Sequence, residues 1–320
     1  MAIFISEADV RSLITIRDAV DAVAAVFKCQ GEGGVINPPR QQINMPGGYL
    51  RLTSAIVSPM EKLAVKVSCS PVFDSNSGRT LILLDSVTGR VDALIEVHGM
   101  GALRTGAASG VATDVLARAD ADTLGVVGPG RQARTQMAAV AAVRPLKKAI
   151  VSGRNPERLA AFCEDMSREL NIPVVAAAQP DEIYDCDILV AATTSKTPVI
   201  FGDRVKPGTH INAIGANRLE RQEIDDAVIP RCAIIAADNK VQSKLESAAL
   251  LRAVEQGAIT WDDVQDLGTY MTNPDSRKRT AEDITLYNSH GVAMEDVALG
   301  KKVFELAVEK GVGIEIPFTE

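Results

Sequence analysis

Three observations predict an α/β protein with a doubly wound parallel sheet and a second, α+β domain. From residue 123 onward, short apolar segments alternate with amphipathic helical segments, which is typical of a parallel sheet with helices on both faces. A Gly-rich turn, Gly128-Pro129-Gly130, lies between the first of these strands and the first helix. Between residues 38 and 96, short strands separated by turn residues predict an antiparallel or mixed sheet. We therefore expect the 320 residues to form two domains.

The N-terminal region is predicted to begin with two helices and to continue as a meander of strands. Ser6, followed by Asp9 three residues later, has the pattern of a helix N-cap, and residues 16–30 carry apolar side chains at helical spacing. A helix rich in Ala, Gly and Ser is expected at 101–117. The expected strands are 40–45, 49–56, 63–68, 80–85 and 91–97.

The rest of the chain is predicted to alternate between strands and helices. We expect strands at 124–127, 149–152, 174–177, 188–191, 209–214 and 233–236, and helices at 132–143, 156–170, near Pro180 and at 221–226. An amphipathic helix at 294–310 is expected to fold back onto the N-terminal region. The predicted domains are residues 1–116 with 294–320, and residues 117–293.

Composition argues against several classes of function. A net charge of −7 and an aromatic content of 4% do not suit a nucleic-acid-binding surface. The N-terminus lacks the pattern of a signal peptide, and no apolar run approaches the roughly 20 residues of a membrane span. The 5 cysteines are scattered without a Cys-x-x-Cys pair, and the 3 histidines lack metal-ligand spacing. We expect a cytoplasmic protein with reduced thiols that binds no metal, nucleic acid or membrane.

The Gly-rich turn predicts a Rossmann-type dinucleotide-binding domain. Gly128 permits a tight turn, Gly130 lets the backbone approach a pyrophosphate, and Ala133 permits close packing of the helix on the strand. The following helix would offer free N–H groups and the positive end of its dipole to the phosphates. The alternative is a Gly-rich loop that only shapes an α/β turn.

The end of the second strand bears on the choice of dinucleotide. An Asp or Glu at this point binds the ribose 2′-hydroxyl of NAD, but the chain here reads Ser152-Gly153-Arg154-Asn155. Arg154, with Arg158 one helical turn later, could pair with a 2′-phosphate. Both NAD(H) and NADP(H) are therefore candidates, with a preference for NADPH or for dual use. The alternative is that Arg154 stacks on the adenine or points to solvent.

Several motifs resemble the ornithine cyclodeaminase/mu-crystallin family, in the family's order and over nearly the whole chain. They are ALRTGAASGVATDVLARADADTLGVVGPGRQARTQ, NPPRQQI with Arg40, KLAVKVS with Lys66, AATTSKTPVI, HINAIGAN and NSHGVAMEDVALG. The family includes cyclodeaminases, alanine dehydrogenases, several imine reductases (among them iminosuccinate reductase), and mu-crystallin, which binds thyroid hormone and NADPH. The resemblance implies a homodimer built through the first domain, with the substrate between that domain and the nicotinamide.

The resemblance also implies the roles of basic residues in the first domain. Arg40 and Arg104 correspond to arginines that hold the substrate α-carboxylate, for which a planar guanidinium is well suited. Lys66 corresponds to a lysine beside the substrate carboxylate and the reacting nitrogen. Strand alternation with the apolar Val65 and Val67 instead favours a surface position for Lys66.

The cofactor-binding residues follow from the fingerprint and the resemblance together. Arg131 and Gln132 correspond to residues that touch the phosphates, and Thr193 and Thr194 lie at the carboxyl end of a predicted strand, where ligands bind in such sheets. The full predicted set is Gly128, Gly130, Arg131, Gln132, Gly153, Arg154, Thr193, Thr194, Ile214, Gly215, Ala216, Asn217, Arg221 and Ser289.

Two departures from the family pattern bear on the reaction. Cyclodeaminases and the archaeal alanine dehydrogenase have Asp where this chain has Asn217, and Asn can only form hydrogen bonds. This favours reduction of an existing C=N bond. His290 stands where an apolar residue is common and could donate a proton or bind a second carboxylate, or could simply form the pocket wall. The candidate catalytic residues are Lys66, His290 and Asn217.

Arg51 suggests the class of substrate. It lies on the strand predicted at 49–56, where alternation allows either orientation and a solvated face is slightly favoured. If Arg51 points inward, the pocket holds more positive charge than one carboxylate requires, and the substrate is a dicarboxylic imine such as iminosuccinate, which would be reduced to L-aspartate. The predicted substrate-binding residues are Arg40, Arg51, Lys66, Arg104 and His290. The predicted function is NAD(P)H-dependent reduction of a small α-imino acid to an L-amino acid. The alternatives are a cyclodeaminase that recycles NAD, and a non-catalytic NADPH-dependent binder of a small molecule.

Overall fold

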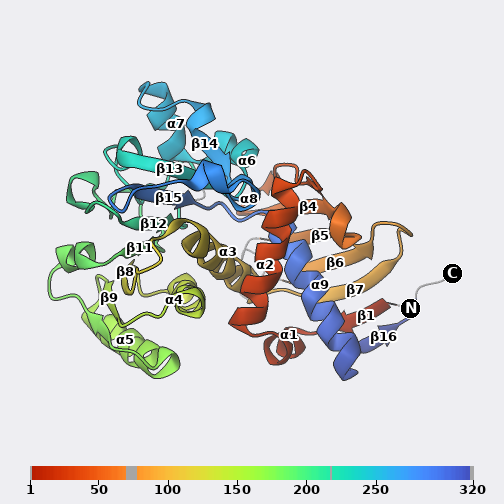
Figure 1. Cartoon of the computed structure of the whole chain (residues 1–320). Coiled ribbons are helices and arrows are strands. Elements are labelled where there is room, and N and C mark those ends of the chain that lie inside the picture. Colours follow the sequence, from red (N-terminus) through yellow and green to blue (C-terminus); the bar gives the residue numbers. More distant parts are fainter. Residues whose placement is uncertain (1, 70–77, 217, 318–320) are drawn as a thin grey trace. The chain divides into compact units, whose positions relative to one another are not determined.

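The computed structural model describes residues 2–69, 78–216 and 218–317, and it divides into two compact units (Figure 1). Unit 1 comprises Met1–Arg104 with Val292–Glu320, and unit 2 comprises Thr105–Gly291. The first division falls inside helix α3 (Met100–Leu116), whereas the sequence places it at 116/117; the second lies close to the expected 293/294. The division falls earlier because Gly106 already packs on helix α4 (Arg131–Val143) of unit 2, where an added Cβ would lie 2.5 Å from the Thr135 carbonyl oxygen.

Unit 1 is built on a mixed sheet. The strand order is β16-β1-β7-β6-β5-β4-β2, with β3 also paired to β4. The β1–β7 pair is parallel and the other pairs are antiparallel. The strands are β1 (Ala2–Ile5), β2 (Val35–Ile36), β3 (Gln41–Met45), β4 (Gly48–Val57), β5 (Lys62–Cys69), β6 (Arg79–Asp85), β7 (Val91–Glu96) and β16 (Ile314–Ile316). The sequence analysis missed β1, β2 and β16, which are too short for their periodicity to be informative.

Helices α1 (Glu7–Leu13), α2 (Ile16–Gly31) and α9 (Ala293–Lys310) complete unit 1. The capping box at Ser6 is confirmed, since Ser6 Oγ accepts from the Asp9 N–H and the Asp9 side chain accepts from the Ser6 N–H. The C-terminal helix α9 packs against β4, β5, β6 and α2, so it returns to the first unit as expected. Gly300 permits this close approach, because an added Cβ would lie 2.6 Å from Leu81 Cδ2.

Unit 2 contains a parallel sheet with the strand order β10-β9-β8-β11-β12-β15-β13-β14, which confirms the doubly wound α/β prediction. Its strands are β8 (Thr123–Val127), β9 (Lys148–Ser152), β10 (Val174–Ala176), β11 (Ile188–Ala191), β12 (His210–Ala213), β13 (Cys232–Ala237), β14 (Val264–Asp266) and β15 (Ile284–Asn288). The chain winds outward in both directions from β8 and β11, so ligands are expected at the carboxyl ends of these two strands.

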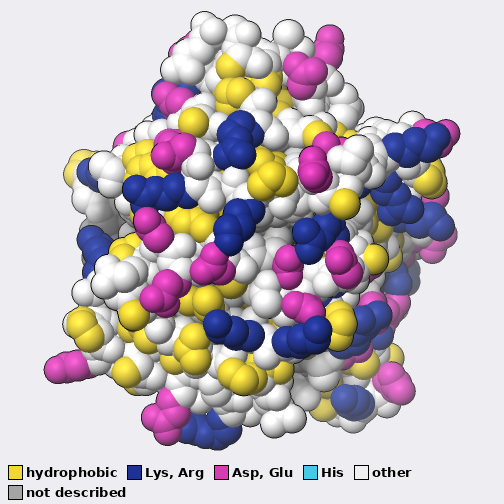
Figure 2. All heavy atoms as spheres, turned by 60° about the vertical axis from the view of Figure 1, so that its left-hand side comes forward, with side chains coloured by type: hydrophobic (Ala, Val, Ile, Leu, Met, Phe, Trp, Pro, Cys, Tyr) yellow, Lys and Arg dark blue, Asp and Glu magenta, His cyan; other side chains and the backbone are white. Residues whose placement is uncertain are grey.

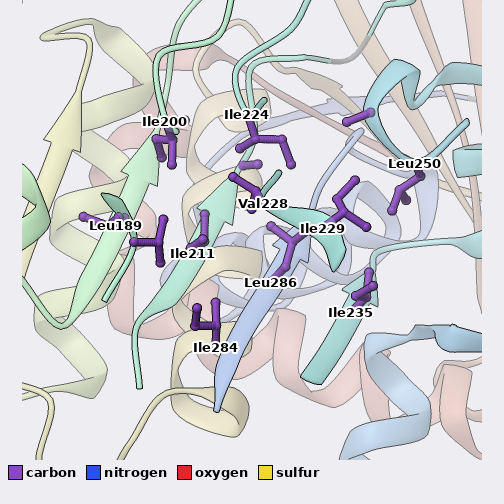
Figure 3. Packing of buried hydrophobic residues seen from close by; sticks show 14 of the residues in the cluster. Leu189, Ile200, Ile211, Ile224, Val228, Ile229, Ile235, Leu250, Ile284 and Leu286 are labelled. Carbon is purple, nitrogen blue, oxygen red and sulfur yellow. The ribbon is translucent and has the colours of Figure 1, made fainter. Parts of the chain in front are cut away.

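The helices of unit 2 cover both faces of its sheet. They are α3, α4 (Arg131–Val143), α5 (Pro156–Leu170), α6 (Lys240–Glu246), α7 (Ala248–Glu255) and α8 (Leu267–Thr272). The short 3-10 helices of the whole chain are η1 (Ser58–Met60), η2 (Pro180–Asp185), η3 (Gly202–Arg204), η4 (Ile229–Arg231), η5 (Trp261–Asp263) and η6 (Pro274–Arg277). On one face of the sheet, Leu189, Ile211, Leu286 and Ile235 from four strands pack into one apolar cluster (Figure 3). Over the residues described, every helix is too short or too polar to span a bilayer.

The helix predicted at 221–226 is wrong. This segment is extended and irregular, and Ile224 forms a parallel bridge with Ile200. Both of these side chains are buried in the apolar cluster of Figure 3. The side chain of Glu223 accepts hydrogen bonds from backbone groups of other loops, which holds the segment away from the helical conformation.

Candidate functional site

Charged side chains occur in two different settings. On the face shown in Figure 2, positive and negative side chains are interspersed over the surface. Exposed pairs of this kind contribute little to stability. In unit 1, by contrast, a set of charged side chains is buried together: Lys66, Arg104, Glu295 and Asp296 are between 0% and 15% exposed. Buried charges are costly unless they are paired, so this set is the first candidate for a functional site.

The buried charges and the half-buried Arg40 form a connected group, which we call the basic–acidic cluster (Arg40, Lys66, Arg104, Glu295 and Asp296). Lys66 Nζ donates a hydrogen bond to Asp296 Oδ2. Arg104 Nη1 donates to Glu295 Oε2 at 3.0 Å, and its Nε lies 3.6 Å from Asp296 Oδ1. Arg40 is close enough for its charge to lower the pKa of Lys66.

Secondary structure explains how these side chains meet. Lys66 comes from the middle of β5, Arg104 from the first turns of α3, and the two acids from the first turn of α9, where the helix dipole favours negative charge. Arg40 lies between β2 and β3. That connection is attached to the start of α9, because Asn37 Oδ1 accepts a hydrogen bond from the Met294 N–H at 2.9 Å.

The electrostatics of Lys66 result from opposing effects. Burial lowers the pKa of Lys66, and the charges of Arg104 and Arg40 lower it further, whereas the charge and hydrogen bond of Asp296 raise it. The overall direction is downward from the ordinary lysine value. The cluster holds three cationic and two anionic side chains, which leaves one net positive charge in a largely buried environment. Such a site is suited to one substrate carboxylate.

The surface orientation that alternation favoured for Lys66 is wrong. In the sheet register, Lys66 pairs with Thr53 on β4 and with Leu81 on β6. Directly paired residues share a face, and Leu81 is 1% exposed beneath α9. Val65 and Val67 occupy the opposite face and are only half-buried. The side chains of β5 do alternate between the two faces of the sheet. The helices cover the face that carries Lys66, and not the face that carries the valines.

Arg51 lies on the same face as Lys66. It is two residues from Thr53, the strand partner of Lys66, which is roughly 7 Å along β4. Arg51 Nη2 donates to Gln42 Oε1 at 2.8 Å, and its guanidinium carbon lies 4.9 Å from the centroid of the Tyr49 ring. The orientation that the sequence left open is thus toward the helix-covered face, in a half-buried setting.

Sequence reasoning missed Glu295 and Asp296. Their partners Arg104 and Lys66 are 191 and 230 positions away in the chain, so only the fold reveals the pairing. The available signal was a pair of adjacent acids in the first turn of the predicted C-terminal helix. Their presence also corrects the expected excess of positive charge, because the two carboxylates compensate two of the cations.

In unit 2, the Gly-rich turn has the geometry that a pyrophosphate site requires. Gly128 has a φ of +98°, and an added Cβ would lie 2.8 Å from the Ala192 carbonyl oxygen. Gly130 is the N-cap of α4, and the space around its missing Cβ is open to 4 Å. Ala133 is fully buried against the sheet. Because glycine has no capping side chain, the first N–H groups of α4 remain directed toward this space, which fits the phosphates of a dinucleotide.

The other predicted phosphate-side and ribose-side residues surround this turn. Arg131 is exposed and Gln132 half-buried in the first turn of α4. Gly153 allows the end of β9 to pack on the turn, since an added Cβ would lie 2.7 Å from Pro129 Cδ. Arg154 follows β9 and is exposed, as is Arg158, whose backbone N–H is capped by Asn155.

The residues predicted on the nicotinamide side lie at the ends of β11 and β12. Thr193 and Gly215 both donate hydrogen bonds to Glu223, a buried residue that the sequence analysis did not single out. Arg221 Nη1 donates to the Gly215 carbonyl oxygen at 3.3 Å. Thr194 is exposed, whereas Ile214 and Ala216 are buried. Asn217 lies outside the described residues.

Ser289 and His290 lie in unit 2 after β15 and are buried, at 1% and 3% exposure. They are held by Asp238, another acid that sequence reasoning missed. Asp238 Oδ2 accepts from Ser289 Oγ at 3.1 Å, the His290 N–H at 2.7 Å and the Gly291 N–H at 2.6 Å. Within 2–69, 78–216 and 218–317, no three His, Cys, Asp or Glu residues are arranged to hold a metal ion.

Comparison with known proteins gives a consistent result over the whole chain. The model of the ornithine cyclodeaminase/mu-crystallin family matches residues 2–311. The iminosuccinate reductase of Paracoccus denitrificans, solved with NAD⁺, is 30% identical with a TM-score of 0.93, over 99% of each chain. The Δ1-pyrroline-2-carboxylate reductase of Thermococcus litoralis, solved with NADH and L-proline, is 31% identical with a TM-score of 0.90, over 98% of this chain and 100% of that one. An archaeal alanine dehydrogenase dimer with bound NAD is 29% identical with a TM-score of 0.90, over 99% of each chain.

Proposed function

The chain belongs to the ornithine cyclodeaminase/mu-crystallin family, and from this premise we propose that it reduces the C=N bond of a small α-imino acid to give an L-amino acid. The observation that carries the proposal is the basic–acidic cluster of unit 1, with its paired Lys66 and its one net positive charge. Reduction of an α-imino acid requires a site that binds the substrate carboxylate and that holds a proton. Solved relatives that act on such substrates support this assignment.

In the proposed mechanism, Arg40 and Arg104 hold the substrate α-carboxylate and so fix the position of the imine carbon. When bound, the reduced dinucleotide supplies a hydride. Lys66 Nζ donates a proton to the imine nitrogen, because the protonated iminium is the better hydride acceptor. Asp296 keeps the Lys66 ammonium charged before this transfer and remains as an anion beside the neutral amine afterwards. His290 is the second candidate donor.

The residues proposed to hold the dinucleotide are those of the α4 turn and the ends of β9, β11, β12 and β15. Gly128, Gly130, Arg131 and Gln132 would bind the pyrophosphate, and Gly153 and Arg154 would face the adenosine ribose. Thr193, Thr194, Ile214, Gly215, Ala216, Asn217, Arg221 and Ser289 would surround the nicotinamide end. The open N-terminus of α4 supports this assignment.

A steady-state panel of imino acids with NADH and NADPH tests the proposal. We expect oxidation of the dinucleotide that matches amino-acid formation, one for one. Release of ammonia from a diamino acid with no net change in dinucleotide absorbance would instead identify a cyclodeaminase. Binding of the dinucleotide and a small molecule with no turnover of any imine would identify a non-catalytic binder.

We further propose that the substrate is a dicarboxylic imine such as iminosuccinate. Arg51 adds a second net positive charge on the Lys66 face of the sheet, which suits a second carboxylate. Arg51→Met is expected to lower kcat/KM for iminosuccinate by about 10- to 100-fold, the value of a charge-assisted hydrogen bond. A monocarboxylic cyclic ketimine should be affected less than about 2-fold, as should both substrates in the exposed control Arg90→Met. Equal rates on the two substrates, with Arg51→Met harmless to both, would contradict the assignment.

We propose that Arg154 makes NADPH an acceptable donor. The strand β9 ends without an acid that would repel a 2′-phosphate, and the Arg154 side chain is exposed at that end. Arg154→Ala is expected to raise the KM for NADPH about 10-fold and to leave the KM for NADH nearly unchanged. Arg168→Ala, on the exposed surface of α5, is the matched control. An equal effect on the two dinucleotides would contradict a contact with the 2′-phosphate.

We propose that the protein is a homodimer formed through the sheet of unit 1. The face opposite Lys66 carries the half-buried Leu63, Val65 and Val67, and Ile43 is 57% exposed. An apolar sheet face of this kind is typical of an interface. Val65→Glu is expected to convert the dimer to a monomer in light scattering, whereas Val87→Glu, in a turn and 73% exposed, should leave it a dimer. A dimeric Val65→Glu variant would exclude this face.

A further inference from the structure

Glu223 is a buried acid that joins the ends of two neighbouring strands of unit 2. Its Oε1 accepts hydrogen bonds from the Thr193 N–H at 2.5 Å and from Thr193 Oγ1 at 2.8 Å. Its Oε2 accepts from the Gly215 N–H at 2.5 Å. Thr193 follows β11 and Gly215 follows β12, so one carboxylate spans both strand ends. The residue is 1% exposed.

The main chain of Glu223 is anchored as firmly as its side chain. Its carbonyl oxygen accepts from the Val199 and Ile200 N–H groups at 2.8 and 2.9 Å. The next residue, Ile224, lies in the apolar cluster beside Ile200 and Val228 (Figure 3). The carboxylate is therefore presented from a fixed support, and displacement of either strand end would break a short hydrogen bond.

The strand ends that Glu223 joins are packed against each other without spare room. A Cβ added to Gly215 would lie 2.0 Å from the Thr193 carbonyl oxygen and 2.5 Å from Glu223 Oε1. The backbones of the two loops are in direct contact, and for this reason only glycine fits at this position. Because the loops follow the central strands of a doubly wound sheet, their positions define one wall of the ligand crevice.

The hydrogen-bonding pattern requires an acceptor at both carboxylate oxygens. All of the bonds described above are donated to the side chain, so a protonated carboxyl would have to direct its own O–H toward a donor. Burial raises the pKa of Glu223 to about 7, and the hydrogen bonds donated by Thr193, Gly215 and Ala216 oppose this rise. These donors stabilise the carboxylate, and the carboxylate in turn holds the two loops.

We propose that Glu223 is the positioning residue of the nicotinamide-side wall: it sets the spacing of Thr193 and Gly215 so that a dinucleotide can bind between the strand ends and the α4 turn. The inference rests on the proposed use of a dinucleotide and deepens it. Glu223 acts through the two loops and is not itself a catalytic residue.

Glu223→Gln tests the inference, because it keeps the shape of the side chain and replaces one acceptor oxygen by an NH₂ group. Either Thr193 or Gly215 then loses its acceptor. We expect the Kd for NADH, measured by fluorescence titration without an imine, to rise about 10-fold. The KM for the imine at saturating NADH should change less than about 2-fold, because unit 1 is untouched. Glu220→Gln, an exposed acid in the same loop, should behave as wild type in both measurements.

Hydrogen exchange supplies a readout that does not depend on activity. Amide exchange at Thr193 or Gly215 should be at least about 10-fold faster in Glu223→Gln than in wild type. Wild-type affinity for NADH and wild-type exchange at both amides would overturn the inference, as would a lower melting temperature with no change in Kd. If Glu223→Gln does not fold, Thr193→Val, which removes the hydroxyl that donates to Glu223 and accepts from the Ser195 N–H, should still raise the Kd about 3-fold, and an unchanged Kd would overturn the inference.

These outcomes are separable from those of the proposed function. Wild-type protein that binds NADH but reduces no imine would refute the imine reductase while leaving the role of Glu223 open to the same titration. Wild-type protein that reduces imines, with Glu223→Gln equal to it in NADH affinity, would refute only the role of Glu223.

Discussion

Replacing Lys66 by methionine is expected to lower kcat/KM for the imine by about 10²- to 10⁴-fold, the usual contribution of a positioned general acid. Methionine retains much of the length and apolar stem of lysine but carries no proton to donate. Coenzyme affinity should be unchanged, because the dinucleotide-binding residues proposed above all lie in unit 2. Initial rates and an NADH fluorescence titration measure the two quantities on the same preparation.

Lys62→Met is the matched control for this experiment. Lys62 lies on the same strand and face as Lys66, is similarly buried at 14% exposure, and pairs with Asp85 and Asp92 at 3.1 and 2.9 Å. Its substitution also breaks ion pairs that a β5 lysine makes, but these pairs lie outside the basic–acidic cluster. We expect kcat/KM within about 2-fold of wild type. Equal losses in the two variants would mean that Lys66 matters only for the integrity of the strand.

Asp296→Asn is expected to lower the free energy of unfolding by about 3–5 kcal/mol, because it leaves the buried Lys66 charge without its carboxylate partner. Denaturant unfolding measures this loss. Asp275→Asn, which breaks an exposed pair with Lys278, should cost less than about 1 kcal/mol. The double variant Lys66→Met, Asp296→Leu should recover part of the stability, since it removes both charges together.

The same substitution has a second expected effect, on the pH dependence of the reaction. Asp296 raises the pKa of Lys66 by its charge and its hydrogen bond, so its neutralisation lowers that pKa further. The alkaline limb of the kcat/KM profile, where Lys66 loses its proton, should therefore move to lower pH. A profile that does not move would show that Lys66 does not supply the proton, and would direct attention to His290.

The sequence predicts most of unit 2 as far as β13, because the strands and helices there have distinct periodicities; it does not predict α6, α7, α8 or β14. Helix α5 and strand β11 were placed with their observed bounds, Pro156–Leu170 and Ile188–Ala191. The strand β15 (Ile284–Asn288) was missed, since a short, fully buried apolar run is not distinguishable from a helical segment by pattern alone. The helix predicted at 221–226 is wrong for another reason, because the conformation of this segment is determined by the tertiary contacts of Glu223.

The site was predictable to the extent that single residues carry recognisable chemistry. The positions of Arg40, Lys66 and Arg104 came from motif resemblance, and the structure brings these three together in unit 1. The partners Glu295 and Asp296 were not predicted, since no local pattern links an acid to a base some 200 positions away. The register that turns Lys66 inward likewise depends on which face of the sheet α9 covers, which is a property of the assembled unit.

The arrangement of the basic residues along the sheet has a consequence for how the substrate range of such a protein evolves. Four members of the basic–acidic cluster (Lys66, Arg104, Glu295 and Asp296) compensate one another's charge, so a change in any one of them carries a large penalty. Arg51 is outside that set, on the neighbouring strand, and is held by the polar Gln42 and the ring of Tyr49. A single codon change there would alter the net charge offered to the substrate side chain without breaking a buried ion pair. If the protein has the function proposed above, selection at Arg51 could exchange acidic for neutral substrates and leave Lys66 and its partners unchanged.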